Sequence, residues 1–263
     1  MSNLLNETIR GQLDHRTIRE FTTDPIPEET MQTLFQVAAQ TASARFLQAV
    51  SIIRVEDQAK RDELARIGKQ PYVARAPEYL LFVADTRRSA KILAEANSDP
   101  GYAGSMHLFR EAFTDACLMA QNLVVAAESL GLGTNYLGNI FNDVSGVIKL
   151  LDLPKFVYPV VGITLGKPNQ KPQLKPRIPA ELRVMVDTYA EPESWTAILA
   201  DYDQEVQTYY DLREANRRVD SFTAQTVKAL TGDKRDDREI VRAIAAQGFQ
   251  AGYRFNDGAA PSN

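Results

Sequence analysis

Cysteine and long apolar runs are scarce in this chain. Among its 263 residues there is one cysteine, so no internal disulfide can form, as is usual for proteins of the reducing cytosol. No uncharged apolar run approaches the ~20 residues that a membrane-spanning helix needs. The first residues also lack the basic start and apolar core of a signal peptide. We therefore expect a cytoplasmic protein that does not contact a membrane.

The residue sets that usually carry catalysis are missing as well. His15 and His107 are the only histidines, so no metal-binding pair one helical turn apart exists, and there is no Gly-x-Ser-x-Gly nucleophile motif. Cys117 lies in the middle of an apolar helical pattern, which predicts an inert core thiol rather than an activated nucleophile. We expect no metal site and no catalytic side chain, so any chemistry would be carried by a cofactor.

Neither strong positive charge nor a nucleotide-binding loop is present. The net charge of −4 and the pI near 5.4 argue against nucleic acid as a partner. The glycine run 131–138 leaves a helix and enters a strand, whereas a dinucleotide fingerprint needs the reverse order. The run 162–168 has Pro168 where a P-loop needs Ser or Thr. An anion bound by this chain would need a local basic pocket.

What is present is an alternation of strand and helix patterns. The run 78–84 is almost continuously apolar, which predicts a strand covered on both faces. The pattern over about 105–130 is apolar nearly all round, as in a helix buried in a large core or against a partner subunit. Gly131 should cap it in the left-handed conformation. Further strands are expected at 50–55, 134–137 and 156–165, and helices at 3–13, 28–41, 58–67, 87–96, 144–151, 194–213, 221–230 and 235–247.

Prolines divide the chain after the last predicted strand. Pro168, Pro172, Pro176 and Pro179 exclude a helix there and predict an extended segment. No convincing strand follows. We therefore predict a single domain, 1–263, with an α/β core at 1–166, an extended arm and helical C-terminal extension at 167–255, and a loose tail at 256–263.

The segment from His15 to Arg19 concentrates groups that suit a phosphate. Arg16 and Arg19 offer planar donor forks, and Thr17 adds a hydroxyl. The alternative is that these residues simply complement the C-terminus of the preceding helix, where a cation contributes about 0.3–1 kcal/mol. Taken alone, the segment favours this alternative.

Two further basic groups follow in the C-terminal third. In an extended chain Lys175 and Arg177 point to the same side and could bind one anion, although a proline-rich segment is often only a spacer. Arg213 and Arg217 are one helical turn apart and could hold a second phosphate-bearing ligand. The alternative for this pair is a solvated, salt-bridged helix face.

Several short motifs follow one another with a characteristic order and spacing. They are His15-Arg-Thr-Ile-Arg19-Glu-Phe-Thr, Ser43 with Phe46-Leu-Gln48, Ser51-Ile-Ile-Arg54, Gln70, Met119-Ala-Gln-Asn122, Ala126-Ala-Glu-Ser-Leu-Gly-Leu-Gly133, Tyr136-Leu-Gly138, Leu174-Lys-Pro-Arg-Ile-Pro179, and Tyr209-Tyr210 with Arg213. With them the chain resembles the nitroreductase superfamily, and within it the group of NADPH-dependent oxygen-insensitive nitroreductases and flavin reductase P. The resemblance extends from residue 4 to about residue 248.

This resemblance implies an α+β, nitroreductase-like fold, with a central, mostly antiparallel sheet flanked by helices and a helical C-terminal extension. It also implies a homodimer with two FMN sites at the subunit interface, and NADPH as hydride donor. It places His15, Arg16, Thr17 and Arg19 at the FMN phosphate and ribityl chain, and Lys175 and Arg177 in the second basic arm of that site. Ser43 matches a position contributed across the interface, Gln70 a position at the flavin edge, and Tyr136, Leu137 and Gly138 the loop beside the isoalloxazine ring. Arg213 matches a residue that binds the NADPH phosphates, and Arg217 and Arg218 are further candidates for this role.

The chain departs from the family pattern at a few positions. Asn139 stands where close relatives often have a second glycine, and Ala44 and Arg45 interrupt a serine-rich stretch beside the flavin. Thr17 replaces the commoner serine and keeps the hydroxyl. These departures concern the shape of the pocket and the choice of electron acceptor.

The function implied by the resemblance is an FMN-dependent, ping-pong transfer of hydride from NADPH to flavin, and then of electrons to a nitroaromatic, a quinone or free flavin. Three alternatives stay open. The first is a flavoenzyme of the same superfamily with one dedicated substrate, such as a dehalogenase or an enone reductase. The second is a non-catalytic FMN-binding or flavin-delivery protein, and the third is an anion-binding scaffold without flavin.

Overall fold

A four-stranded antiparallel sheet forms the centre of the fold. The computed structural model describes residues 5–214, 220–232 and 237–250. The strands β1 (Val50–Arg54), β2 (Glu78–Asp85), β3 (Gly133–Leu137) and β4 (Val157–Gly166) lie in the order β1-β2-β4-β3. All neighbouring pairs are antiparallel, with a register irregularity in β2 between Phe82 and Val83. The predicted α+β class and antiparallel sheet are confirmed.

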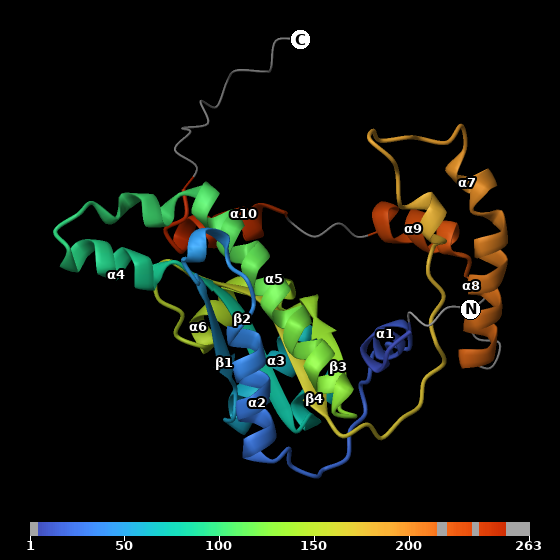
Figure 1. The fold of residues 1–263 in the computed structure, drawn as a ribbon, viewed down its shortest axis with the longest axis horizontal. Helices are drawn as coiled ribbons and strands as arrows, with labels where there is room; N and C mark the ends of the chain where they lie inside the picture. Colours follow the sequence, from blue (N-terminus) through green and yellow to red (C-terminus); the bar gives the residue numbers. More distant parts are fainter. Residues whose placement is uncertain (1–4, 215–219, 233–236, 251–263) are drawn as a thin grey trace. The chain divides into compact units, whose positions relative to one another are not determined.

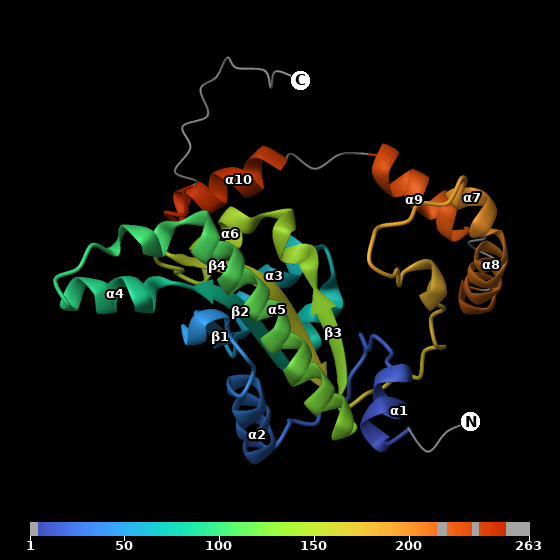
Figure 2. The same cartoon turned by 45° about the horizontal axis from the view of Figure 1, so that its top comes forward.

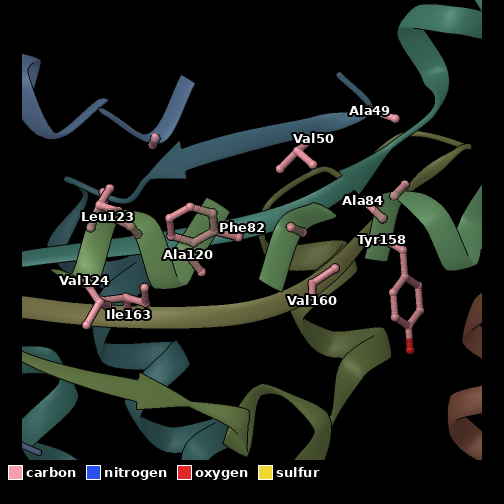
Figure 3. Close-up of a cluster of buried hydrophobic side chains, with 14 of the residues drawn as sticks. Ala49, Val50, Phe82, Ala84, Ala120, Leu123, Val124, Tyr158, Val160 and Ile163 are labelled. Atoms are coloured by element: carbon pink, nitrogen blue, oxygen red, sulfur yellow. The ribbon is translucent and has the colours of Figure 1, made fainter. Parts of the chain in front are cut away.

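Strand β2 is buried on both faces, as its apolar run predicts. Because successive side chains point to opposite faces of a strand, the run supplies two hydrophobic clusters at once. Leu80, Phe82 and Ala84 belong to the first cluster, and Tyr79, Leu81 and Val83 belong to the second. Figure 3 shows Phe82 facing Ala120 and Leu123, with Val124 and Ile163 beside them.

Each face of the sheet is covered by its own helices. Helices α2 (Glu28–Ala39) and α5 (Met106–Ser129) pack in the first cluster. Helices α3 (Gln58–Gly68) and α6 (Val144–Leu150), with the short turns η2 (Pro71–Arg75) and η4 (Gly138–Asn142), pack in the second. Figures 1 and 2 show α5 running across one face of the sheet and α3 and α6 on the opposite side. Helix α1 (Glu7–Leu13) precedes the first basic segment, and α4 (Arg87–Glu95) and η3 (Pro100–Gly104) connect β2 to α5.

Helix α5 begins and ends where the sequence predicts. The Ser105 hydroxyl accepts a hydrogen bond from the Leu108 N–H at 3.2 Å, and Gly131 has the left-handed φ of 78°. The expectation that Cys117 is a core residue is wrong, because its side chain is exposed. The buried stripe of α5 includes Ala112, Ala116 and Ala120, and Cys117, about 100° around the helix from Ala116, lies at the edge of this stripe. Although α5 is apolar on nearly every side, only part of its surface is buried.

The chain divides into two compact units, 1–171 with 237–263, and 172–236. In the first unit α10 (Asp237–Ala246) returns to the core, where the Phe249 ring lies 4.7 Å from the Phe109 ring. The C-terminal extension is thus split, and its last helix belongs to the core unit. The predicted tail, 256–263, lies outside the described residues.

The second unit has a small core of its own. It contains η5 (Ala180–Leu182), α7 (Trp195–Ile198), α8 (Ala200–Glu214) and α9 (Phe222–Thr231). Leu199, Tyr202, Val206 and Tyr209 are buried there, with Ile178 of the extended arm packed against them. Of the helices in the described ranges, none combines the length and the apolar character required to cross a bilayer.

Candidate functional site

The segment from His15 to Arg19 lies along the start of strand β3. The Ile18 N–H donates a hydrogen bond of 2.8 Å to the Thr134 carbonyl, and Thr17 forms a parallel bridge to the same residue. A side chain at Gly133 would come within 2.7 Å of the Ile18 side chain, so this close approach requires glycine. The backbone of the basic segment is therefore positioned by the sheet.

A carboxylate from the last turn of α5 holds the beginning of this segment. His15 Nδ1 lies 2.8 Å from Glu128 Oε1, and the hydroxyl of the buried Thr134 donates to the same oxygen at 2.7 Å. One acidic side chain thus ties helix α5, strand β3 and the basic segment together. In the sequence Glu128 is part of the Ala126–Gly133 motif and an acid in a mainly apolar helix, but neither feature predicts its contact with His15.

The two arginines of the segment have unused hydrogen-bond donors. Arg16 Nη1 donates to the Asp14 carbonyl at 2.9 Å and the guanidinium also pairs with the Asp14 carboxylate. Arg16 Nε is buried and has no partner among the described residues. Half-buried Arg19 makes no hydrogen bond or ion pair within the described part of the chain. Such donors fit an anion, and charge-assisted bonds to phosphate are among the strong ones.

The second predicted basic arm belongs to the second unit. Exposed Arg177 folds back on its own backbone, because its Nη1 donates to the carbonyls of Lys175 at 2.8 Å and Pro176 at 3.2 Å. The Tyr202 hydroxyl donates to the Pro176 carbonyl at 3.3 Å and so ties the arm to α8. That Lys175 and Arg177 bind the same anion as the first segment stays a prediction.

Gln70 and the loop after β3, predicted to lie in one site, are in direct contact. The Gln70 carbonyl oxygen accepts hydrogen bonds from the Tyr72 hydroxyl at 2.6 Å and from Asn139 Nδ2 at 2.8 Å. Asn135 Nδ2 lies 3.3 Å from the Tyr72 hydroxyl. Residues 133–139 and 68–72 therefore form one polar cluster at the end of α3.

The three residues predicted beside the flavin ring differ in what they can offer a ligand. Tyr136 is 37% exposed and donates to Gln121 Oε1 at 3.0 Å, and desolvation raises the pKa of its hydroxyl, with smaller contributions from Glu128 and Cys117. The Leu137 side chain is buried in the core, so only its backbone could reach a ligand. Gly138 is exposed, and the place of its missing side chain is open.

Ser43 begins a tight loop, η1 (Ala44–Phe46), whose backbone is held by a buried acid. The Ser43 hydroxyl accepts from the Gln48 N–H at 3.2 Å. The Ala44 N–H donates to Asp115 Oδ2 at 2.9 Å. Burial raises the pKa of the Asp115 carboxyl, and the bond from Ala44 acts in the opposite direction. Sequence reasoning did not find Asp115, although it too is an acid within an apolar helical pattern.

The same loop presents an aromatic side chain to solvent from a strained backbone. Arg45 and Phe46 have φ values of 50° and 57°, which are unfavourable for residues other than glycine. Two bonds of 3.0 and 2.6 Å join the Arg45 guanidinium to Glu111, while Phe46 is 82% exposed. Arg45, one of the departures from the family pattern, thus fixes the loop that displays Phe46.

The predicted NADPH residues lie mostly beyond what the structure describes. Arg213 belongs to the last turn of α8, and Arg217 and Arg218 lie outside the described residues. Their role stays a prediction.

Known proteins resemble this chain in both sequence and fold. A family model described as "Nitroreductase family" matches residues 13–167, and one described as "Nitroreductase family, C-terminal domain" matches residues 175–251. The chain is 38% identical, over 88% of its length and 94% of theirs, to the NADPH-flavin oxidoreductase of Vibrio harveyi and to the oxygen-insensitive NADPH nitroreductase of Salmonella typhimurium. The solved structure of the NADPH:FMN oxidoreductase from Vibrio harveyi complexed with NAD+ superimposes with a TM-score of 0.82 at 36% identity, covering 92% of this chain and 98% of that one.

Proposed function

The chain belongs to the nitroreductase family, and from this premise we propose that it is an NADPH-dependent flavin enzyme that binds FMN. Its electron acceptors are nitroaromatics, quinones or free flavin. The names of the NADPH-flavin oxidoreductase and NADPH nitroreductase relatives support the donor and the acceptor class. A cytoplasmic location is part of the proposal.

The observation that carries FMN binding is the pair of arginines with unused donors beside β3. Arg16 has a buried Nε without a partner among the described residues, and Arg19 has a guanidinium without an ion pair there. Both fit the phosphate of FMN, with Thr17 and His15 shaping the segment. FMN, when bound, supplies the redox chemistry by accepting hydride from NADPH and giving up electrons to the acceptor.

In this proposal the protein binds and orients FMN and the substrates and excludes water from them, and no side chain acts as acid or base. Lys175 and Arg177 add positive charge on the flavin side. Gln70, Tyr136, Gly138 and the Leu137 backbone contact the ring. Arg213, with Arg217 and Arg218, binds the NADPH phosphates. NADPH and the acceptor use the same place in turn, which makes the kinetics ping-pong.

We also propose that the enzyme is a homodimer. The exposed side of α5 carries Cys117, and Leu118 there is 51% exposed, while Leu130 just after the helix is 56% exposed. Apolar surface of this kind is expected at a subunit interface. The loop that starts at Ser43 would then reach the flavin of the second subunit, with Phe46 at the pocket.

A single dedicated acceptor is the second candidate. It is favoured by Arg45, because its two bonds to Glu111 fix the Phe46 loop in one shape. A rigid loop would restrict which flat molecules fit the pocket.

The test is an anaerobic titration of the purified protein reconstituted with FMN. We expect a yellow protein that NADPH bleaches faster than NADH does, and that nitroaromatics or quinones recolour. Because the kinetics are ping-pong, double-reciprocal plots of rate against NADPH concentration, at several acceptor concentrations, should be parallel. Failure to bind FMN would overturn the proposal. A yellow protein that NADPH leaves unbleached would indicate flavin delivery, and slow recolouring by all these acceptors would indicate a dedicated substrate.

A further inference from the structure

Two asparagines of η4 close the C-terminal end of α3. Asn142 Nδ2 donates to the Ile67 carbonyl at 3.1 Å, and Asn139 Nδ2 donates to the Gly68 carbonyl at 3.2 Å. Carbonyls in the last turn of a helix lack partners within the helix, so both bonds satisfy orphan acceptors. Within the described ranges, only Asn139 makes a second bond, to the Gln70 carbonyl oxygen at 2.8 Å. The two residues are therefore a matched pair that differs in this contact.

The contact with a backbone carbonyl decides which way the amides point. The Gly68 carbonyl can only accept, so Asn139 must present its NH2 group to it. The same nitrogen lies next to Gln70, so Gln70 must present its oxygen. The Tyr72 hydroxyl donates to that oxygen too, at 2.6 Å. The Gln70 oxygen is thus saturated, while its NH2 group has no partner among the described residues.

Asn139 can take this place only because residue 68 is glycine. A Cβ on Gly68 would lie 2.1 Å from Asn139 Nδ2 and 2.7 Å from its Cγ. These distances leave no room for both side chains. The glycine at the end of α3 and the asparagine in η4 therefore depend on each other, although they are 71 positions apart in sequence.

We propose that Asn139 is a positioning residue that holds Gln70 as a hydrogen-bond donor toward the flat ring bound in this site. The inference rests on the proposed function, since that ring is the isoalloxazine of FMN. The ring atom that faces Gln70 must be an acceptor, a carbonyl oxygen or a ring nitrogen. A fixed donor binds more strongly when that edge is richer in electrons, so Asn139 favours the reduced flavin through Gln70.

The first test uses the flavin-free protein and needs no activity. Side-chain NH2 signals in 15N NMR spectra are assigned by their loss in Gln70→Ala and Asn139→Ala. We expect slow hydrogen exchange for Asn139, whose two protons are bonded, and fast exchange for Gln70. Slow exchange at Gln70 with fast exchange at Asn139 would overturn the proposed orientation.

The second test measures the ratio of affinities for reduced and oxidised FMN, from the potentials of bound and free flavin. Asn139→Ala should lower this ratio about threefold to tenfold, the size of one hydrogen bond. Asn142→Ala removes the matching helix cap without touching Gln70, and should leave the ratio unchanged. Both variants should lower the thermal midpoint, and Asn139→Ala at least as much as Asn142→Ala, because it also loses the bond to Gln70.

A double variant separates positioning from any other effect of Asn139. In a Gln70→Ala background, Asn139→Ala should leave the ratio unchanged, because the group that it positions is gone. A ratio that is unaffected in the single variant, or that falls equally in the Gln70→Ala background, would overturn the inference. A protein that binds no FMN would overturn the proposed function instead, and the exchange pattern would still test the orientation of Gln70.

Discussion

The two basic segments that we propose contribute to FMN binding are held in place by different kinds of contact. The first is fixed by distant parts of the chain, since His15 is joined to Glu128, 113 positions away, and Ile18 to Thr134. The second is fixed locally, by proline and by the bond of Tyr202 to the Pro176 carbonyl, 26 positions away. The geometry of the first depends on the sheet, and that of the second on the stiffness of a short stretch.

The difference extends to the donors themselves. Arg16 and Arg19 have N–H groups without partners in the described structure, whereas Arg177 already donates to two carbonyls of its own segment. A ligand that binds Arg177 through the same N–H must displace these bonds. The first segment is thus preorganised for an anion and should contribute more of the phosphate affinity.

The largest effect is expected from removing these arginines. Arg16→Ala or Arg19→Ala should weaken FMN binding about 10- to 100-fold, because a hydrogen bond to a charged group contributes about 1.5–3 kcal/mol. Arg177→Ala should cost less. Flavin fluorescence titrations measure all three, and a greater loss for Arg177→Ala would reverse the comparison.

The anchor of the first segment can be tested without a ligand. Glu128→Ala leaves His15 and the buried Thr134 hydroxyl without their shared acceptor, at a cost of about 1–3 kcal/mol. The thermal midpoint of the flavin-free protein should fall by about 2–10 °C. Glu128→Gln keeps an acceptor oxygen, so it should lower the thermal midpoint less. Equal midpoints for both variants and the wild type would show that Glu128 is not an anchor.

The second segment should instead respond to stiffness. Pro176→Gly makes the unbound arm more flexible, with a cost of about 0.4–1 kcal/mol for ordering it. FMN affinity should therefore fall about two- to fivefold. Pro192→Gly, in the same unit but outside the arm, is the control. The same loss in both variants would contradict a specific role of the arm.

The smallest effect should come from Asp14, which pairs with Arg16. Asp14→Asn should strengthen FMN binding by only about 1.5- to threefold, because an exposed ion pair, at the lower end of about 0.2–1 kcal/mol, no longer competes. Asp24→Asn removes the same charge from a surface pair with Lys167 and controls for net charge. Equal gains in both variants would indicate a general charge effect.

Much of the fold could be predicted from periodicity. The buried strand β2 and the Gly131 cap follow from local patterns, and the helices and strands lie within a few residues of the expected ranges. The antiparallel order of the strands did not follow from these patterns and was expected only from the resemblance to the nitroreductase superfamily. Cys117 was misplaced because hydrophobicity does not distinguish a core face from an exposed apolar face of one helix.

The partners within the site could not be predicted in this way. Glu128, Asp115 and Tyr72 act through contacts with residues that are mostly far apart in sequence, and no spacing rule connects them. Asn139 could be flagged as a departure from the family pattern. Its link to Gly68 and Gln70 required the fold that brings η4 to the end of α3.

The central claim, that residues 15–19 hold the phosphate of FMN, is tested most directly by comparing FMN with riboflavin, which lacks that phosphate. Wild-type protein should bind FMN at least about 100-fold more tightly than riboflavin, since two arginines make charge-assisted bonds to the phosphate. In the Arg16→Ala/Arg19→Ala double variant this preference should largely vanish, while riboflavin affinity stays unchanged. Equal affinity of the wild type for the two flavins, or an undiminished preference in the double variant, would contradict the account.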